Sequence, residues 1–359
     1  MSDPVVGPVP VGQILGAEIE ERGWTQADFA AVLGRPTQFV SEIITGKKEI
    51  TRESAAQIGA ALGTTPEYWL NLQDAYLLDE QAKDAATQGE LDKVRRRARL
   101  SKLAPISTLI KRGIIQGRTV EEQEAELKEL FELNDIDDEP GFVLAARRSN
   151  KSEELSAAQM TWVACVRREA RARPAAATLS KKRLADLAAQ LPQFLAAPEK
   201  FRDLPDLLAA AGIRLVYVEA LPGAKIDGCA FVLDGQPVIG LSGRGKRMDK
   251  ILFTLLHELA HLVLGHVSPQ EIIVEEVEQH AHGSAREKAA NDLAGSWILP
   301  QPLPFTRERI NQAWITRVAE ERGIAPIVVI GQLQNLKRLD WRSTLAKNAP
   351  TVTDVLADW

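Results

Sequence analysis

The stretch FTLLHELAHLVLGH, residues 253–266, places two histidines four residues apart, with a glutamate directly after the first. A helix advances about 100° per residue, so His257 and His261 share one face and can bind one Zn²⁺. Glu258 is then placed to act as a general base toward water that zinc activates. The five-residue pattern HELAH (257–261) alone leaves a second interpretation open, in which both histidines are structural residues of a buried helix.

A catalytic zinc site needs a third protein ligand and an open fourth position. His266 follows His261 by five residues, about 500° along a continuing helix, which favours a helix-terminal or surface residue over a ligand. His280 and His282 lie in a predicted loop, and their ligation stays open.

A later predicted helix, AREKAANDLAGSWILP (285–300), offers the better third ligand. Glu287 and Asn291 are four residues apart and project together. A carboxylate suits zinc binding, and a polar neighbour one turn later suits the orientation of a ligand imidazole. The alternative for Glu287 is an exposed surface charge, and the residues alone favour that alternative.

The region from about residue 203 has an α+β pattern. A short helix precedes the alternating strand IRLVYV (213–218), and GCAFVLDGQPVIGLS (228–242) predicts a hairpin around Asp234-Gly235. Pro237 cannot donate to a central ladder, so we expect its strand to begin at a sheet edge or to lie along one. An edge strand of this hairpin could then hold an extended peptide.

Residues 11–76 predict a bundle of five short helices. Thr25 and Asp28 form a capping-box pattern, Gly34 stops the second helix, and Pro36 opens the third. The second and third helices, joined by a tight turn, are a candidate helix-turn-helix. Use of this bundle for protein contacts alone is the alternative.

Residues 77–200 predict a helical middle region. VEEQEAELKELFEL (120–133) and KKRLADLAAQLPQFLAA (181–197) have amphipathic periods. The basic clusters KVRRRARLSK (93–102) and RREARARP (167–174) indicate solvated helix faces, with nucleic-acid contact as the alternative.

The composition is that of a globular protein: 359 residues, 45% hydrophobic, with a net charge of −5 that argues against general nucleic-acid affinity. Cys165 and Cys229 are far apart, which favours reduced thiols. No stretch has the pattern of a signal peptide or a membrane span, so we expect a cytoplasmic protein.

DGCAFVLDGQPVIGLSGRGKRMDKILFTLLHELAHLVLGH (227–266), followed by EKAANDLAGSWILP (287–300), resembles the ImmA/IrrE family of zinc metallopeptidases. The resemblance covers roughly residues 203–345. It implies a gluzincin-like site with His257, His261 and Glu287 as Zn²⁺ ligands, Glu258 as general base and Asn291 as a supporting residue.

RGWTQADFAAVLGRPTQFVSEIITGKKEIT (22–51) and LGTTPEYWLNLQ (62–73) resemble XRE-type helix-turn-helix proteins, particularly HigA antitoxins. In that family the third helix enters the major groove of DNA. Five Lys and Arg residues stand against ten Asp and Glu within residues 1–76, so nonspecific affinity should be weak. The matched DNA-contact positions are Thr37, Gln38, Ser41, Lys47 and Lys48.

We therefore expect a mainly α chain with a small α+β domain. Its expected parts are a helix-turn-helix domain (11–76), a helical middle domain (77–200) and a zincin-like metallopeptidase domain (203–350) with a short sheet. The expected function is that of a transcriptional regulator whose zinc endopeptidase domain cleaves a partner protein such as a repressor or toxin. Expected partners are double-stranded operator DNA, that protein and a second copy of the chain, without membrane binding. The alternatives are a non-enzymatic HigA-like antitoxin or transcription factor whose zincin domain only binds a ligand or partner, and a purely structural fold without metal.

Overall fold

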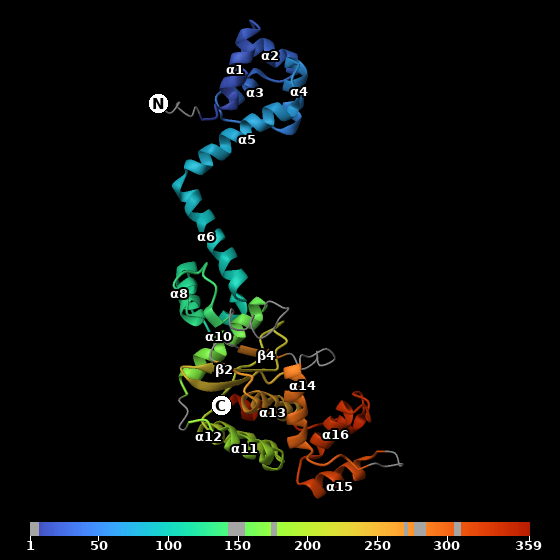
Figure 1. Ribbon diagram of the computed structural model, residues 1–359. Helices are drawn as coiled ribbons and strands as arrows, with labels where there is room; N and C mark the ends of the chain where they lie inside the picture. Colours follow the sequence, from blue (N-terminus) through green and yellow to red (C-terminus); the bar gives the residue numbers. More distant parts are fainter. Residues whose placement is uncertain (1–6, 143–154, 174–177, 269–271, 276–284, 305–309) are drawn as a thin grey trace. The chain divides into compact units, whose positions relative to one another are not determined.

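The computed structural model describes residues 7–142, 155–173, 178–268, 272–275, 285–304 and 310–359. The chain forms two compact units, Met1–Arg96 and Arg97–Trp359, and each unit has its own hydrophobic core. The structure is mainly helical with one four-stranded mixed sheet in the second unit (Figure 1), which confirms the predicted fold class. Within the described residues, no helix combines the length and apolar character needed to cross a membrane.

The first unit contains the predicted bundle of five helices. Local signals set their ends: a capping box joins Thr25 and Asp28, and Gly34 adopts the left-handed conformation that ends the second helix. A second capping box joins Thr51 and Ser54 at the start of the fourth helix. The helices are α1 (Val11–Glu21), α2 (Gln26–Leu33), α3 (Thr37–Ile44), α4 (Arg52–Leu62) and α5 (Pro66–Lys83).

The bundle closes around large apolar side chains contributed by every helix. Leu15, Phe29, Val40, Ile58 and Trp69 are each 0% exposed. Burial of that many large side chains stabilises the bundle, at about 1.5–3 kcal/mol for each fully buried aliphatic group before the loss of chain entropy. The bundle therefore has a core of its own.

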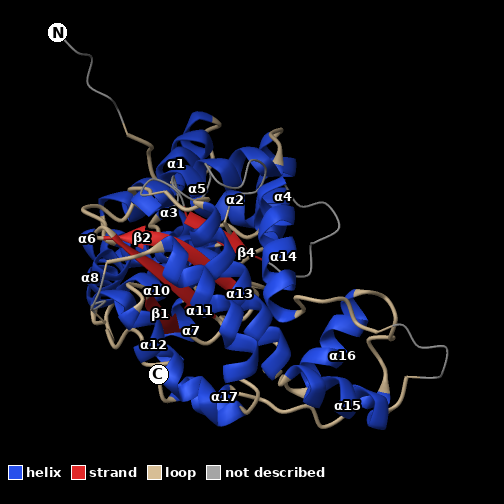
Figure 2. Cartoon of the chain, turned by 60° about the horizontal axis from the view of Figure 1, so that its bottom comes forward, coloured by secondary structure: helices blue, strands red, loops and turns tan. Residues whose placement is uncertain are grey.

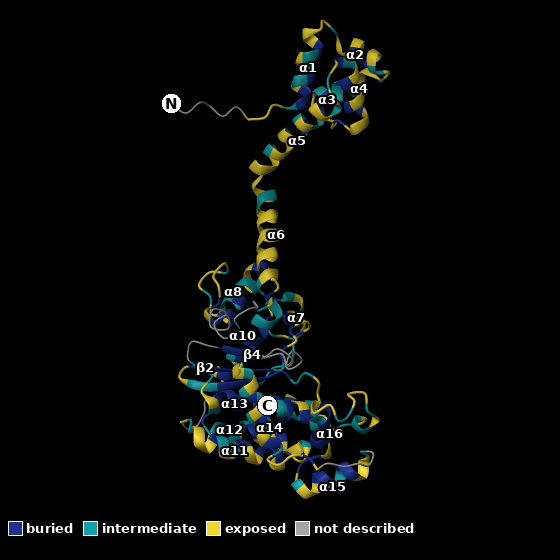
Figure 3. Ribbon diagram, turned by 45° about the vertical axis from the view of Figure 1, so that its right-hand side comes forward, coloured by how far each residue is buried: buried dark blue, intermediate teal, exposed yellow. Residues whose placement is uncertain are grey.

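Helix α6 (Ala85–Leu103) follows α5 and spans the boundary between the units. Most of its residues are exposed (Figure 3), as expected for a sequence rich in charge with few apolar positions. Ion pairs one turn apart, Lys93 with Glu90 and Arg95 with Asp92, lie along its surface. This agrees with the interpretation of 93–102 as a solvated helix face.

The second unit is built around the sheet, with helices on both faces. Figure 2 shows the strands in red and the helices in blue. Its helices before the sheet are α7 (Ile106–Lys111), α8 (Val120–Phe131), α10 (Ala157–Arg171), α11 (Lys181–Phe194), η1 (Pro198–Asp203) and α12 (Leu204–Ala210). Those that follow the first three strands are α13 (Met248–Leu264), α14 (Ala285–Ile298), α15 (Gln312–Arg322), α16 (Pro326–Asn335), η3 (Thr344–Ala346) and α17 (Thr353–Ala357). The two amphipathic helices predicted in the middle region are α8 and α11.

The strand order is β1-β3-β2-β4, with β1 (Arg214–Tyr217), β2 (Gly228–Leu233), β3 (Gln236–Leu241) and β4 (Ile272–Glu275). β1 is parallel to β3, whereas β2 is antiparallel to both of its neighbours. Ile239 belongs to the core shared with α11, α12 and α13, and Val238 belongs to the core shared with α7, α8 and α10. Alternate residues of one strand thus bury against opposite layers.

The hairpin prediction is confirmed, because Asp234 and Gly235 join β2 to β3 with positive φ angles of 51° and 77°. The expectation of a strand at the sheet edge is wrong for this hairpin: β3 lies between β1 and β2, and the edges are β1 and β4. Pro237 is tolerated because the register with β1 begins only at Val238. Because β1 has no residue paired with Pro237, the absent N–H of Pro237 leaves no hydrogen bond of the β1–β3 ladder unmade.

Residues 97–200 belong to the same compact unit as the sheet and α13. Trp162 of α10 donates from its indole Nε1 to the carbonyl of Val218, just after β1, at 2.7 Å. Arg167 and Arg171 of α10 both bind the carboxylate of Glu132 at the end of α8. The division into three domains at about residues 76 and 200 stays a prediction.

Candidate functional site

His257 and His261 lie on one face of α13, as their spacing predicts. Apolar residues surround α13 on nearly all sides, so it forms the centre of the second unit, and both histidines are 0% exposed. Their Nε2 atoms are 2.9 Å apart and their ring centroids 4.7 Å apart. The two imidazoles therefore present the same ring nitrogen to one point.

Glu287 of α14 reaches that point from the neighbouring helix. Ala290 and Ala294, both 0% exposed, provide small side chains where α14 packs against α13 (Figure 1). Glu287 Oε2 lies 3.4 Å from His257 Nε2 and 3.4 Å from His261 Nε2. In the described part of the chain, these three residues are the one group of His, Cys, Asp and Glu side chains arranged to hold a metal ion.

Glu258 is 0% exposed and faces β2. A Cβ atom added to Gly228 of β2 would lie 2.5 Å from Glu258 Oε1 and 2.8 Å from Thr254 Cγ2. Burial raises the pKa of the neighbouring Cys229 thiol well above its usual value, and the negative charge of Glu258 raises it further. A glycine in β2 is therefore what makes room for the Glu258 carboxylate.

Asn291 lies one turn after Glu287 on α14 and is partly buried. Its carboxamide Oδ1 is buried and makes no hydrogen bond within the described residues. Its role beside a ligand imidazole stays a prediction. His280 and His282 lie outside the described residues.

His266 lies just past the end of α13 and outside the group formed by Glu287 and the two buried histidines. Its Nδ1 is 3.1 Å from Nδ1 of His261. Burial is the main cause that lowers the pKa of His266, followed by the positive charges of His261 and Arg286. The sequence argument that His266 points away from the shared face missed this contact.

The exposed face of α3 carries the side chains expected to contact DNA. Thr37 and Gln38 are exposed and Ser41 is partly buried, whereas Val40 and Ile43 face the bundle core. Lys47 and Lys48 are exposed just after the helix.

Glu42 also lies on that face and was missed by the sequence argument. Gln38 Nε2 donates to Glu42 Oε1 at 2.8 Å, and Lys48 Nζ lies 3.9 Å from Glu42 Oε2. The signal was present in the sequence, because residues 38 and 42 are four apart on one helix.

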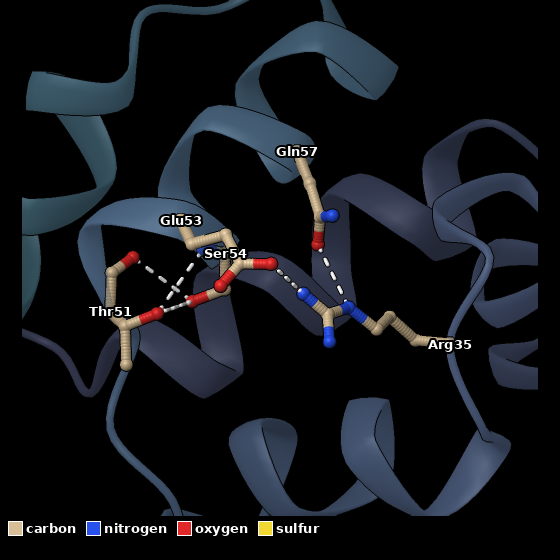
Figure 4. Close-up of polar contacts among 5 residues, drawn as sticks. All are labelled: Arg35, Thr51, Glu53, Ser54 and Gln57. Carbon is tan, nitrogen blue, oxygen red and sulfur yellow. Dashed lines mark hydrogen bonds and ion pairs between the residues drawn. The ribbon is translucent and has the colours of Figure 1, made fainter.

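The turn before α3 is tied to α4 (Figure 4). Arg35 donates from Nε to Gln57 Oε1 at 3.0 Å and from Nη2 to the carboxylate of Glu53. The Arg35 guanidinium also lies over the ring of Phe39, 5.4 Å from its centroid. These contacts hold the first turn of α3 against α4.

Two family models match the two units. A helix-turn-helix model (HTH_3) matches residues 15–69, and an IrrE N-terminal-like domain model (Peptidase_M78) matches residues 210–325. Both predicted resemblances are thereby confirmed, and His257, Glu258, His261 and Glu287 all lie within the second match.

Relatives of known sequence match the N-terminal unit. An uncharacterized HTH-type transcriptional regulator, YddM, of Escherichia coli (strain K12) is 32% identical over 72 residues, which cover 20% of this chain and 77% of the relative. Antitoxin HigA-1 of Vibrio cholerae is 42% identical over 69 residues, which cover 19% of this chain and 65% of that protein.

Among solved structures, an addiction module antidote protein of a HigA family from Coxiella burnetii is 35% identical, covering 24% of this chain and 94% of that chain with a TM-score of 0.22.

The chain belongs to the helix-turn-helix family through its N-terminal bundle. Its second unit carries an IrrE N-terminal-like domain of the Peptidase_M78 family.

Proposed function

We propose that this chain is a transcriptional regulator that joins a DNA-binding bundle to a zinc-dependent endopeptidase domain. The observation that carries the proposal is the convergence of two buried imidazole Nε2 atoms and the Glu287 carboxylate on one point. An ordinary surface carboxylate would have no reason to approach both histidines equally. The membership of the second unit in the Peptidase_M78 family supports the same function.

The donor set fits zinc. Two neutral imidazoles and one carboxylate are a ligand set of catalytic zinc sites, with bond lengths of about 2.0–2.2 Å. Tetrahedral ligands at that distance lie about 3.3 Å from one another. The two separations between histidine Nε2 and Glu287 Oε2 are 3.4 Å, and the two Nε2 atoms are closer together, at 2.9 Å. We therefore propose that His257, His261 and Glu287 hold Zn²⁺, leaving a fourth position for water and substrate.

Zinc, when bound, supplies Lewis acidity that polarises a peptide carbonyl and acidifies water. Glu258 is adjacent in sequence to His257 and is not one of the three converging ligands. In the proposed mechanism its carboxylate takes a proton from the attacking water and passes it to the leaving amine. Full burial of Glu258 excludes bulk water from the carboxylate before the substrate binds.

We propose that an extended segment of the substrate pairs with β4 rather than with the β2–β3 hairpin. β4 is an edge of the sheet, whereas both hairpin strands are interior. β4 pairs with β2, whose Gly228 lies against Glu258. Main-chain hydrogen bonds at such an edge bind a peptide largely independently of its sequence.

The N-terminal bundle is proposed to bind double-stranded operator DNA through α3. The exposed Gln38 side chain and the nearby Lys47 and Lys48 suit a base edge and the phosphate backbone, respectively. Helix-turn-helix proteins bind two half-sites as dimers, so we expect a homodimer.

The proposed protein partner is a repressor or a toxin. The likeness of the N-terminal bundle to antitoxin HigA-1 favours a second candidate function, in which the chain is an antitoxin whose zincin domain binds zinc or a partner without turnover. Metal analysis of the purified full chain tests both proposals against a metal-free structural role. One zinc per chain is expected; a chain without zinc after preparation in zinc-containing buffer contradicts both.

A further inference from the structure

The last turn of α13 determines where His266 lies. Gly265 adopts the left-handed conformation, with φ 73° and ψ 28°. The backbone N–H of Gly265 donates to the carbonyl of Leu262 at 3.2 Å, and that of His266 donates to the carbonyl of His261 at 2.9 Å. This pair of bonds is a Schellman motif, which folds the residue after the glycine back over the last helical turn.

The fold-back explains why a rotation of about 100° per residue does not predict the position of His266. A continuing helix would place this residue away from His261, but the helix ends at Gly265 and the chain reverses. The His266 ring stands edge-on to the His261 ring, with centroids 5.1 Å apart and an interplanar angle of 63°. In many Schellman motifs the residues at these two positions make an apolar contact; here they are the imidazoles of His261 and His266.

The two nitrogens of His261 face different partners. Its Nε2 lies 2.9 Å from His257 Nε2 and 3.4 Å from Glu287 Oε2. Its Nδ1 lies 3.1 Å from His266 Nδ1, on the other side of the ring. His266 therefore contacts the nitrogen of His261 that does not face the proposed metal position.

We propose that His266 is a positioning residue for His261. His266 Nδ1 accepts a hydrogen bond from Nδ1–H of His261, which fixes the tautomer whose Nε2 lone pair points toward His257 and Glu287. This inference rests on the proposed zinc site. Ligand histidines usually use their second nitrogen in this way, most often with a carboxylate, a carbonyl or water as acceptor. An imidazole acceptor orients the ring without adding a negative charge.

Zinc affinity of the full chain, measured by competition with a chelator, tests the proposal. His266→Phe retains an aromatic ring and removes the acceptor, and His266→Ala removes the acceptor without adding volume. Both should bind zinc about 10–100-fold more weakly. His266→Asn is the conservative variant, because its Oδ1 takes the place of Nδ1 and can accept the same bond; it should bind zinc close to wild type.

Two results would overturn the proposal. Wild-type zinc affinity in both His266→Phe and His266→Ala would show that the contact does not orient His261. Loss of stoichiometric zinc from all three variants, including His266→Asn, would make His266 a ligand. Thermal unfolding of the metal-free variants identifies any variant that has lost its fold, in which case the other acceptor-free variant decides.

A second measurement uses the metal-free full chain and is independent of the proposed function. Nitrogen-15 NMR of the histidine rings reports which nitrogen of His261 carries the proton. The wild type should hold the proton on Nδ1, and His266→Phe should show a mixture of both tautomers. The same tautomer in both proteins contradicts the positioning role. A wild-type chain that binds no zinc but holds the Nδ1 tautomer would contradict the proposed function and leave the hydrogen bond established.

Discussion

Gly228 of β2 lies directly against Glu258 of α13: a Cβ atom at Gly228 would be 2.5 Å from Glu258 Oε1. The position of β2 therefore limits where the carboxylate of Glu258, the proposed general base, can lie. Real Cβ atoms essentially never lie within 3.0 Å of another atom, and ordinary van der Waals contact begins at 3.4 Å, so a methyl group must displace the carboxylate by about 0.5–1 Å. The backbone of β2 and the side chain of α13 thus occupy positions that depend on each other.

This relationship makes the first prediction. Gly228→Ala should lower the rate of peptide hydrolysis by up to about 100-fold, the loss that a misplacement of about 1 Å can cause, while the chain keeps its zinc. The measurement is cleavage rate together with zinc content. Gly295→Ala on α14 is the matched control, because nothing lies within 4 Å of the added Cβ, and it should cleave at the wild-type rate. Equal rates for all three proteins would contradict the placement of Glu258.

The second prediction concerns the ligands. His257→Ala and His261→Ala should abolish stoichiometric zinc, since a catalytic site needs three protein ligands. Glu287→Ala should weaken zinc binding more than the about 10–100-fold loss typical of a supporting residue. Chelator competition measures all three. Full zinc affinity in Glu287→Ala would show that another residue is the third ligand, and His280 would be the next candidate.

Local signals in the sequence predicted the elements well. The capping box of Thr25 with Asp28 and the turn at Asp234-Gly235 depend only on neighbouring residues, and both are present in the structure. The face shared by His257 and His261 is likewise a property of one helix. Such features do not depend on how distant parts of the chain pack.

Features that depend on packing or on a change of chain direction were harder to predict. The approach of Glu287 to the histidines arises where α14 packs on α13. Helix spacing made Glu287 only a candidate ligand, and the family resemblance made it the expected one. The position of His266 depends on the helix stop at Gly265, which the angular argument ignored. Pro237 lies in an interior strand because the neighbouring β1 ladder begins one residue later.

The third prediction concerns base recognition. Gln38→Ala should relax sequence preference at one base position, costing about 1–3 kcal/mol for the preferred base, if Gln38 reads a base edge. Selection from a random pool of duplexes by the full chain measures the preference. The Gln38 amide already donates one N–H to Glu42 and retains a second donor and its carbonyl for a base. An unchanged preference would assign base reading to other residues of α3.

The fourth prediction compares two adjacent lysines. Lys47→Ala should weaken binding to all DNA sequences and lower the slope of log affinity against log salt by about one. Lys48→Ala should have a smaller effect, because Lys48 Nζ lies 3.9 Å from Glu42 Oε2 and 4.9 Å from the Phe39 ring centroid. Affinities at several salt concentrations check both. Equal salt slopes for wild type and Lys47→Ala would remove Lys47 from the DNA contact.

The most direct test of the central claim is proteolysis by the wild-type chain and by Glu258→Gln, with zinc content measured in the same samples. The substitution preserves the shape of the side chain and removes its ability to take a proton. Each protein is incubated with the proteins encoded beside it, and cleavage products are identified by mass. The account predicts one zinc per chain in both proteins, defined fragments with the wild type, and none with Glu258→Gln. Zinc in both proteins without fragments from either, or the same fragments from both, would contradict an endopeptidase that uses Glu258.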